Sequence, residues 1–206
     1  MLNAIERGTV EQVIRSRRSV RRFRPDPVAD AEVEALLDAA RWAPSPHNSQ
    51  PWRFVLVRAG ETRRRLAEAM ADRWRADLAA HREASEPVLQ KVETRRRRLI
   101  EAPVAIVVCL TGERLDVYPD AERRAAEWLT AEHSLGAAVQ NLLLTARARG
   151  LGACWICAPA FCPETVREAL ALPPAWAPRA LILVGYPAAP AASSSRLPLA
   201  DLVVVR

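Results

Sequence analysis

Apolar residues recur along most of the chain at the spacing of an α-helix. This spacing predicts a first helix from Thr9, which opens the capping-box sequence TVEQ, to about Arg17. It predicts a second helix, capped by Asp30, that runs to about Trp42. A strongly charged stretch, residues 61–98, is also helical with a break near Pro87, and a long helix covers residues 121–149. The pattern therefore predicts a protein rich in amphipathic helices.

Shorter apolar runs between these helices predict β-strands. The expected strands cover residues 52–57, 102–110, 153–158 and 179–185, with a last one at 202–205. A short helix begins at Pro163, because proline is favoured at the first helical position. No repeat or linker interrupts the order of elements, which predicts a single α+β domain over residues 1–206.

Composition is that of an ordinary globular domain. Half of the 206 residues are hydrophobic, and the longest apolar run near the middle, residues 102–110, is far too short to cross a membrane. The N-terminus has no apolar signal core, so we expect no export, a cytoplasmic location and reduced thiols. The net charge is +6, but Lys91 is the only lysine among the 30 basic residues and no nucleic-acid-binding motif accompanies them. Binding to nucleic acid or to a membrane is therefore not expected.

Three of the four cysteines lie within GACWICAPAFC, residues 152–162. A zinc site needs four ligands, usually as two close pairs, and Cys154 and Cys157 have no second pair. A thioredoxin-like dithiol needs its Cys-x-x-Cys motif at a helix N-terminus, whereas this motif lies on a predicted strand. Neither a metal site nor a dithiol site is the favoured interpretation.

Two polar segments are candidates for ligand binding. RRSVRR, residues 17–22, offers guanidinium groups that match phosphate oxygens, but this segment alone favours a solvated basic surface. SPHNSQPW, residues 45–52, places serine, asparagine and glutamine between prolines. Such a stiff loop suits recognition of a planar heterocycle, or it is only a tight turn.

Taken in order, several motifs resemble the nitroreductase family of FMN-dependent oxidoreductases. They are RRSVRRF, LLDAARWAPSPHNSQPWRFV, a long helix that ends in GLGACWI, and SRLPLADLV. APSPHNSQPWRFV, YPDAERRAAEW and GAAVQNLLLTARARGLGACWI also resemble the nitroreductase-like domain of coenzyme F420 biosynthesis proteins, here without a fused ligase domain. The resemblance implies a mostly antiparallel central sheet flanked by helices and a long central helix. It also implies a homodimer with FMN at the interface and a C-terminal tail that reaches the partner subunit.

The resemblance assigns roles to particular residues. The FMN phosphate and ribityl chain would be held by Arg17, Arg18, Ser19 and Arg21, with Arg196 reaching the phosphate from the tail. The flavin ring would be lined by Ser45 and Asn48, usually from the partner subunit, with Gln50 also among the cofactor-binding residues. Trp155, Ile156 and Cys157 would run beside its reactive edge.

Residues 61–120 resemble the variable substrate-capping region of the family. Trp74 and Asp77 are candidate substrate contacts there, although a packed tryptophan and a solvated aspartate are the favoured alternatives. The arginines at 63–65 and 95–98 are interpreted as solvated helix faces, or as groups that steer an anionic precursor.

The resemblance implies that the flavin carries the chemistry, so no catalytic acid–base residue is expected. The implied reaction is reduction of the double bond of dehydro-F420-0, with NAD(P)H as a candidate donor. The alternatives are a general NAD(P)H-dependent nitro or quinone reductase, and a flavin- or F420-binding protein without turnover. Relatives that make the dimethylbenzimidazole ligand of vitamin B12 fit less well, because PSPHNSQPW departs from their loop.

Overall fold

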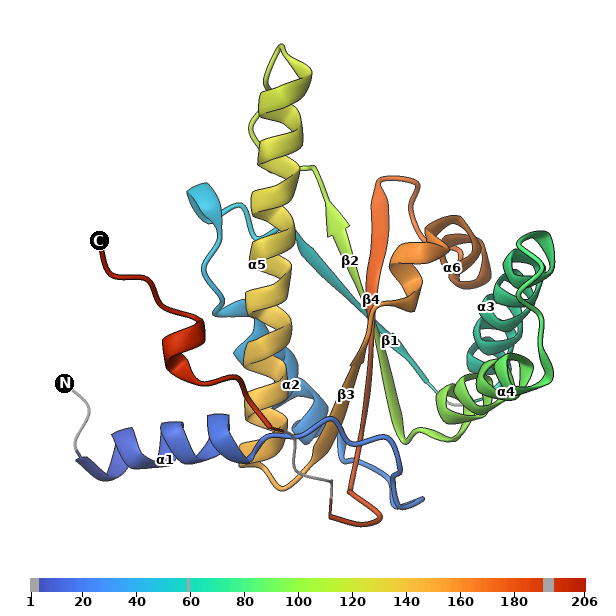
Figure 1. Ribbon diagram of the computed structural model, residues 1–206, viewed down its shortest axis with the longest axis horizontal. Coiled ribbons are helices and arrows are strands. Elements are labelled where there is room, and N and C mark those ends of the chain that lie inside the picture. The colour runs from blue at the N-terminus through green and yellow to red at the C-terminus, as the bar shows by residue number, and fades with distance from the viewer. Residues whose placement is uncertain (1–3, 59, 191–194) are drawn as a thin grey trace.

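The centre of the fold is a four-stranded antiparallel sheet (Figure 1). The computed structural model describes residues 4–58, 60–190 and 195–206, and the side chains from residue 9 onward. The strands lie in the order β1–β2–β4–β3. Their bounds are β1 Trp52–Val57, β2 Val104–Thr111, β3 Gly152–Ile156 and β4 Trp176–Gly185. The predicted α+β fold with a mostly antiparallel central sheet is confirmed.

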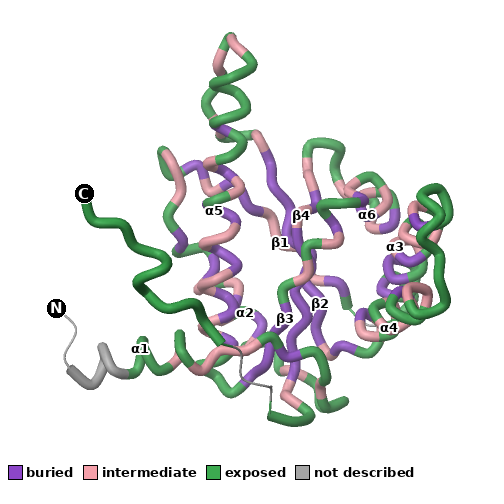
Figure 2. Tube along the Cα trace, in the orientation of Figure 1, coloured by how far each residue is buried: buried purple, intermediate pink, exposed green. Residues whose placement is uncertain are grey.

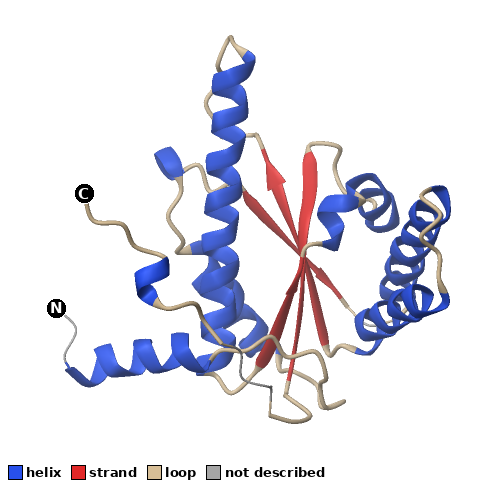
Figure 3. Cartoon of the chain, in the orientation of Figure 1, coloured by secondary structure: helices blue, strands red, loops and turns tan. Residues whose placement is uncertain are grey.

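Helices cover both faces of the sheet (Figure 3). The α-helices of the described chain are α1 Ala4–Ser16, α2 Asp30–Arg41, α3 Glu61–Ala80, α4 Glu86–Glu101, α5 Ala121–Ala148 and α6 Pro163–Leu170. Short 3-10 turns are η1 Pro46–Asn48, η2 Ala158–Phe161 and η3 Leu199–Asp201. No helix in the described residues is long and apolar enough to cross a membrane.

Side-chain alternation along β2 divides the core into two layers. Ile106 and Val108 pack toward α2 and α5, while Ala105 and Val107 pack toward α3, α4 and α6. All eight residues of β2 are buried because both of its faces are covered. Figure 2 shows the buried positions concentrated in the strands and on the helix sides that face them, whereas the C-terminal tail is exposed.

Several sequence-based expectations about element ends are wrong. α1 begins at Ala4, so Thr9 lies inside the helix and does not cap it. Ala29 precedes α2, and the Asp30 carboxylate contacts the Arg58 guanidinium at 3.1 Å instead of capping the helix. Residues 202–205 form no strand, because the tail leaves the sheet and has no neighbouring strand to pair with.

Candidate functional site

The arginine-rich segment after α1 lies along the outer edge of β3. Ser19 pairs with Ala153 in a parallel bridge, and the Val20 N–H donates to the Ala153 carbonyl at 2.9 Å. A Cβ atom on Gly152 would lie 2.7 Å from the Val20 Cβ, which is too close for a side chain. Glycine at position 152 therefore permits the close approach that fixes this segment against the sheet.

A cavity of about 660 Å³ lies between the end of β3 and the hairpin formed by α3 and α4. Its volume is within the roughly 300–1,000 Å³ of small-molecule sites. The apolar part of its wall includes Met70, Leu99, Ile156, Leu181 and Leu183. The predicted residues that line it are Arg21, Trp155, Ile156, Cys157, Trp74 and Asp77. Chain segments far apart in the sequence thus meet at one hollow.

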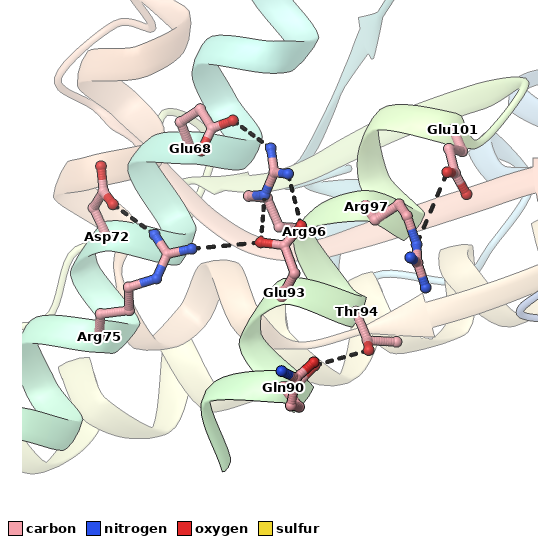
Figure 4. Close-up of polar contacts among 9 residues, drawn as sticks. All are labelled: Glu68, Asp72, Arg75, Gln90, Glu93, Thr94, Arg96, Arg97 and Glu101. Carbon is pink, nitrogen blue, oxygen red and sulfur yellow. Dashed lines mark hydrogen bonds and ion pairs between the residues drawn. The ribbon is translucent and has the colours of Figure 1, made fainter. Parts of the chain in front are cut away.

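Arginines from α4 form another part of this wall. Arg95, Arg96 and Arg98 line the cavity. The interpretation of residues 95–98 as a solvated face holds for Arg95, which is exposed, but not for Arg96 and Arg98, which are partly buried. Arg97 fits that interpretation, because it lies outside the cavity lining and pairs with Glu101 at 3.9 Å (Figure 4). The spacing of Arg95 and Arg98 with the buried Leu99 was a signal in the sequence, since residues three and four apart share a helix face.

Arg63 also departs from the sequence-based interpretation. It is 2% exposed, and its guanidinium donates to the Val57 carbonyl from Nη2 at 2.6 Å and to the Ala102 carbonyl. Burial lowers the pKa of its guanidinium. Arg63 therefore ties the start of α3 to the end of β1 and to the chain entering β2, while its neighbour Arg64 remains exposed.

Trp74 of α3 and Arg95 of α4 lie together at the cavity. The Arg95 guanidinium carbon is 4.5 Å from the centroid of the Trp74 ring. Trp74 is half-buried and packs on the small hydrophobic cluster between these helices. Asp77, one helical turn along α3, accepts a hydrogen bond from Arg73 Nε at 2.9 Å and is not simply solvated. Only the α3–α4 part of the expected capping region flanks the cavity, because β2 is a central strand.

Three thiols line the cavity, and all four cysteines of the chain are free. Burial raises the pKa of Cys154 and Cys162, and it raises the pKa of Cys109 in β2 to about 12. Cys157 is exposed and follows the last residue of β3. The described residues contain no group of three or more His, Cys, Asp or Glu side chains placed to hold a metal ion.

Arg17 and Arg18 lie at a second cavity, of about 550 Å³, on the α5 side of the arginine segment. The Arg18 guanidinium donates to the carbonyls of Arg15 and Arg17 at 2.6 and 2.8 Å. Ser16 and Arg147 also line this cavity, and Arg147 Nε donates to Ser16 Oγ at 2.9 Å. The structure thus places Arg17 and Arg18 at one cavity and Arg21 at the other, with the exposed Ser19 between them.

The polar loop before β1 is held by its own side chains. The Gln50 backbone N–H donates to Ser45 Oγ at 3.1 Å, and Gln50 Nε2 donates to Asn48 Oδ1 at 3.2 Å. His47, Asn48 and Gln50 have positive φ angles, so the loop is tightly bent. None of its residues lines either cavity, and Figure 1 shows the loop on the α5 side of the sheet, away from α3 and α4.

Arg196 lies on the exposed tail that follows residues 191–194, which fall outside the described chain. Its Nη1 donates to the Ser195 carbonyl at 2.9 Å, and it lines neither cavity. Within one chain the structure therefore brings together Arg21, residues 155–157, Trp74 and Asp77, but not the loop at 45–50 or the tail.

A cavity of this size, lined by apolar side chains and arginines, indicates a small-molecule-binding protein. Comparison with known proteins identifies the family. The model of the nitroreductase family matches residues 14–186. An NADH dehydrogenase from Thermus thermophilus is 38% identical over 197 residues, which are 92% of each chain. A 5,6-dimethylbenzimidazole synthase from Rhodospirillum rubrum is 33% identical over 181 residues, which are 88% of this chain and 83% of that protein.

A solved structure supports the same assignment. A Desulfovibrio desulfuricans protein assigned as a nitroreductase, in complex with FMN, matches with a TM-score of 0.74 and 32% identity, over 100% of this chain and 98% of that one. The chain therefore belongs to the nitroreductase family, whose members are FMN-dependent oxidoreductases. The family-level resemblance predicted from the motifs is confirmed.

Proposed function

We propose that this protein binds FMN in the cavity beside β3 and transfers hydride from NAD(P)H to a small-molecule acceptor, dehydro-F420-0. The observation that carries the proposal is the meeting of Arg21, the end of β3 and the apolar wall of α3 and α4 at one cavity. The relative from T. thermophilus is an NADH dehydrogenase, which supports a nicotinamide donor.

The chemistry of the cavity wall fits FMN. Met70, Leu99 and Leu183 offer an apolar surface for a flat ring, and they keep bulk water from that side. The guanidinium groups of Arg21 and Arg98 suit the oxygen atoms of the FMN phosphate and the carbonyl oxygens of the flavin ring. Each guanidinium donates several hydrogen bonds in one plane. When bound, FMN supplies the hydride chemistry, so the residues of the chain need only bind, orient and shield it.

The proposed site is completed by a second copy of the chain. The loop with Ser45 and Asn48 lies away from the cavity of its own chain, so its predicted place beside the flavin requires a partner subunit. Exposed apolar side chains on α5 and the tail support such an interface. They include Trp128, Leu129, Leu197, Leu199 and Val204. We expect sedimentation equilibrium to show a dimer. In that dimer Arg17, Arg18, Ser19 and Arg196 would lie near the cofactor phosphate, as the resemblance to the family implies.

The choice of acceptor rests on the three F420-like segments of the sequence and on charge. F420 precursors carry phosphate and carboxylate groups, which suit a cavity lined by five arginines and two carboxylates. Dehydro-F420-0 is therefore the acceptor to test first.

The test begins with the absorption spectrum of the purified protein, with and without added FMN. Oxidised-flavin bands that co-elute with the protein support the cofactor, whereas a colourless protein that ignores FMN overturns it. The reduced holoenzyme is then offered dehydro-F420-0 and a nitroaromatic compound in parallel. Turnover of the nitroaromatic alone would reject the F420 assignment and leave a general reductase, and FMN binding without turnover would indicate a binding protein.

A further inference from the structure

We infer that Arg95, stacked on Trp74, is a specificity-determining residue that makes the enzyme prefer planar acceptors carrying an anionic group. The inference rests on the proposed function, because it concerns the acceptor at the same cavity. It adds a specific anion-binding residue and a general class of acceptor.

The contact with Trp74 places the guanidinium over the aromatic ring. Arg95 lies with its guanidinium carbon 4.5 Å from the centroid of the Trp74 ring, and both residues line the cavity. A guanidinium that stacks on an aromatic ring keeps the N–H groups at its edge available for hydrogen bonds. Arg95 is exposed, which places the group where the cavity meets solvent and where an acceptor enters.

Trp74 and Arg95 are set in place by the contacts between α3 and α4. Buried Ala71, Leu78 and Val92 form the hydrophobic cluster on which Trp74 packs. Ion pairs also join the two helices, and Figure 4 shows Arg96 of α4 reaching Glu68 and Arg75 of α3 reaching Glu93. A binding group on a pre-organised support loses less conformational entropy when the ligand binds.

The described chain pairs no carboxylate with Arg95, although Glu83 also lines the cavity. Arg73 pairs with Asp77 at 2.9 Å, and Arg96 pairs with Glu93 at 2.7 Å. By contrast, the structure of the described chain shows no carboxylate paired with Arg21, Arg95 or Arg98. A cavity with unpaired guanidinium groups attracts anions, and the partly enclosed setting strengthens that attraction.

Arg95 and Arg21 belong to different walls. Arg21 comes from the segment along β3, and Arg95 comes from α4 on the hairpin. Arg21 therefore suits the cofactor phosphate, while Arg95 stays available for a carboxylate, sulfonate or phosphate on the acceptor. The expected ligand is a flat conjugated molecule with such a group at its rim.

The test uses FMN-loaded enzyme and two acceptors of similar size and shape. Para-nitrobenzoate carries a negative charge, whereas para-nitrobenzamide is neutral. Arg95→Gln should lower kcat/KM for the benzoate by about tenfold or more, since it removes a charge-assisted hydrogen bond. The amide should change by less than about twofold, and the Kd for FMN should stay the same. Arg97→Gln is the matched control, because it removes the same charge from the same helix outside the cavity lining.

Equal losses for both acceptors, or weaker FMN binding, would overturn the inference and place Arg95 in the cofactor site. If Arg97→Gln lowers kcat/KM for the benzoate as much as Arg95→Gln does, the inference is also wrong, because the net charge of the helix and not a specific contact would explain the loss. Calorimetric titration with benzoate and benzamide provides a readout that needs no turnover. If the protein shows no reductase activity but still binds benzoate in preference to benzamide through Arg95, the proposed reaction is wrong and the inference about Arg95 stands. If the enzyme reduces both acceptors without a preference that depends on Arg95, the inference is wrong and the proposed reaction stands.

Discussion

Replacement of Arg63 by methionine tests whether a buried guanidinium holds the α3–α4 hairpin to the sheet. The change keeps an unbranched apolar stem and removes the donors that serve the Val57 and Ala102 carbonyls. Val57 and Ala102 are 2% and 3% exposed, so water has little access to replace the lost donors.

The expected loss follows from those two acceptors. A hydrogen bond from a charged donor contributes about 1.5–3 kcal/mol, so the loss of both bonds costs about 3–6 kcal/mol. Removing the guanidinium also relieves the desolvation penalty of a buried cation, which offsets part of that cost. We therefore expect the free energy of unfolding to fall by about 3 kcal/mol.

Urea unfolding followed by circular dichroism, at one protein concentration for all variants, measures this loss. Arg64→Met is the matched control, because Arg64 is the next residue of α3 and its side chain is 59% exposed. We expect that variant to change stability by less than about 0.5 kcal/mol. If the two variants unfold within about 1 kcal/mol of each other, the hydrogen bonds of Arg63 do not hold the hairpin as argued.

Further predictions concern the arginine segment, the thiols and acid stability. Gly152→Ala should displace the segment through its clash with Val20 and weaken FMN binding measured by fluorescence, whereas Gly136→Ala, whose Cβ meets its nearest atom at 3.8 Å, should not. In the FMN-free native protein, Ellman's reagent at mildly alkaline pH should react rapidly with Cys157 alone, because burial raises the pKa of the other thiols. A rapid reaction that persists in the Cys157→Ser variant would contradict this prediction. The hydrogen bond from Arg149, the residue that follows α5, lowers the pKa of Glu32 in the folded state. The pair therefore stabilises the fold at pH values above the unfolded-state pKa of Glu32, and this stabilisation is lost as the pH falls through the lower folded-state pKa. Glu32→Gln should thus make the free energy of unfolding less sensitive to acid below about pH 4. An unchanged pH profile of stability would contradict this prediction.

Local sequence patterns predicted most of the regular elements. The strand at Trp52–Val57 and the start of α6 at Pro163 agree with the structure, and the break near Pro87 corresponds to the turn between α3 and α4. The false strand at 202–205 has the same apolar character as the true ones. Its failure shows that a strand also requires a neighbour, which local sequence does not reveal.

The structure brings only part of the predicted site together within one chain, for a related reason. Ile156 and Cys157 follow from the order of motifs, and their place at a cavity with Arg21 agrees with that order. The sequence interpretation left open which arginines of the run at 95–98 line the cavity, because identical neighbours obscure the helical spacing that links Arg95 and Arg98 to Leu99. The loop of Ser45 and Asn48 lies apart from the cavity, and nothing in a single chain brings it there.

The sequence by itself determined the periodic elements and the family, because helix and strand periods and short motifs are properties of neighbouring residues. The tertiary structure alone decided which chemically identical side chains have which role. In the run at 63–65, Arg63 is buried and Arg64 is exposed, and in the run at 95–98, Arg95 meets the cavity while Arg97 does not. Each residue turns a helix by about 100°, so adjacent arginines point in different directions. What each one meets depends on strands and helices that are distant in the chain.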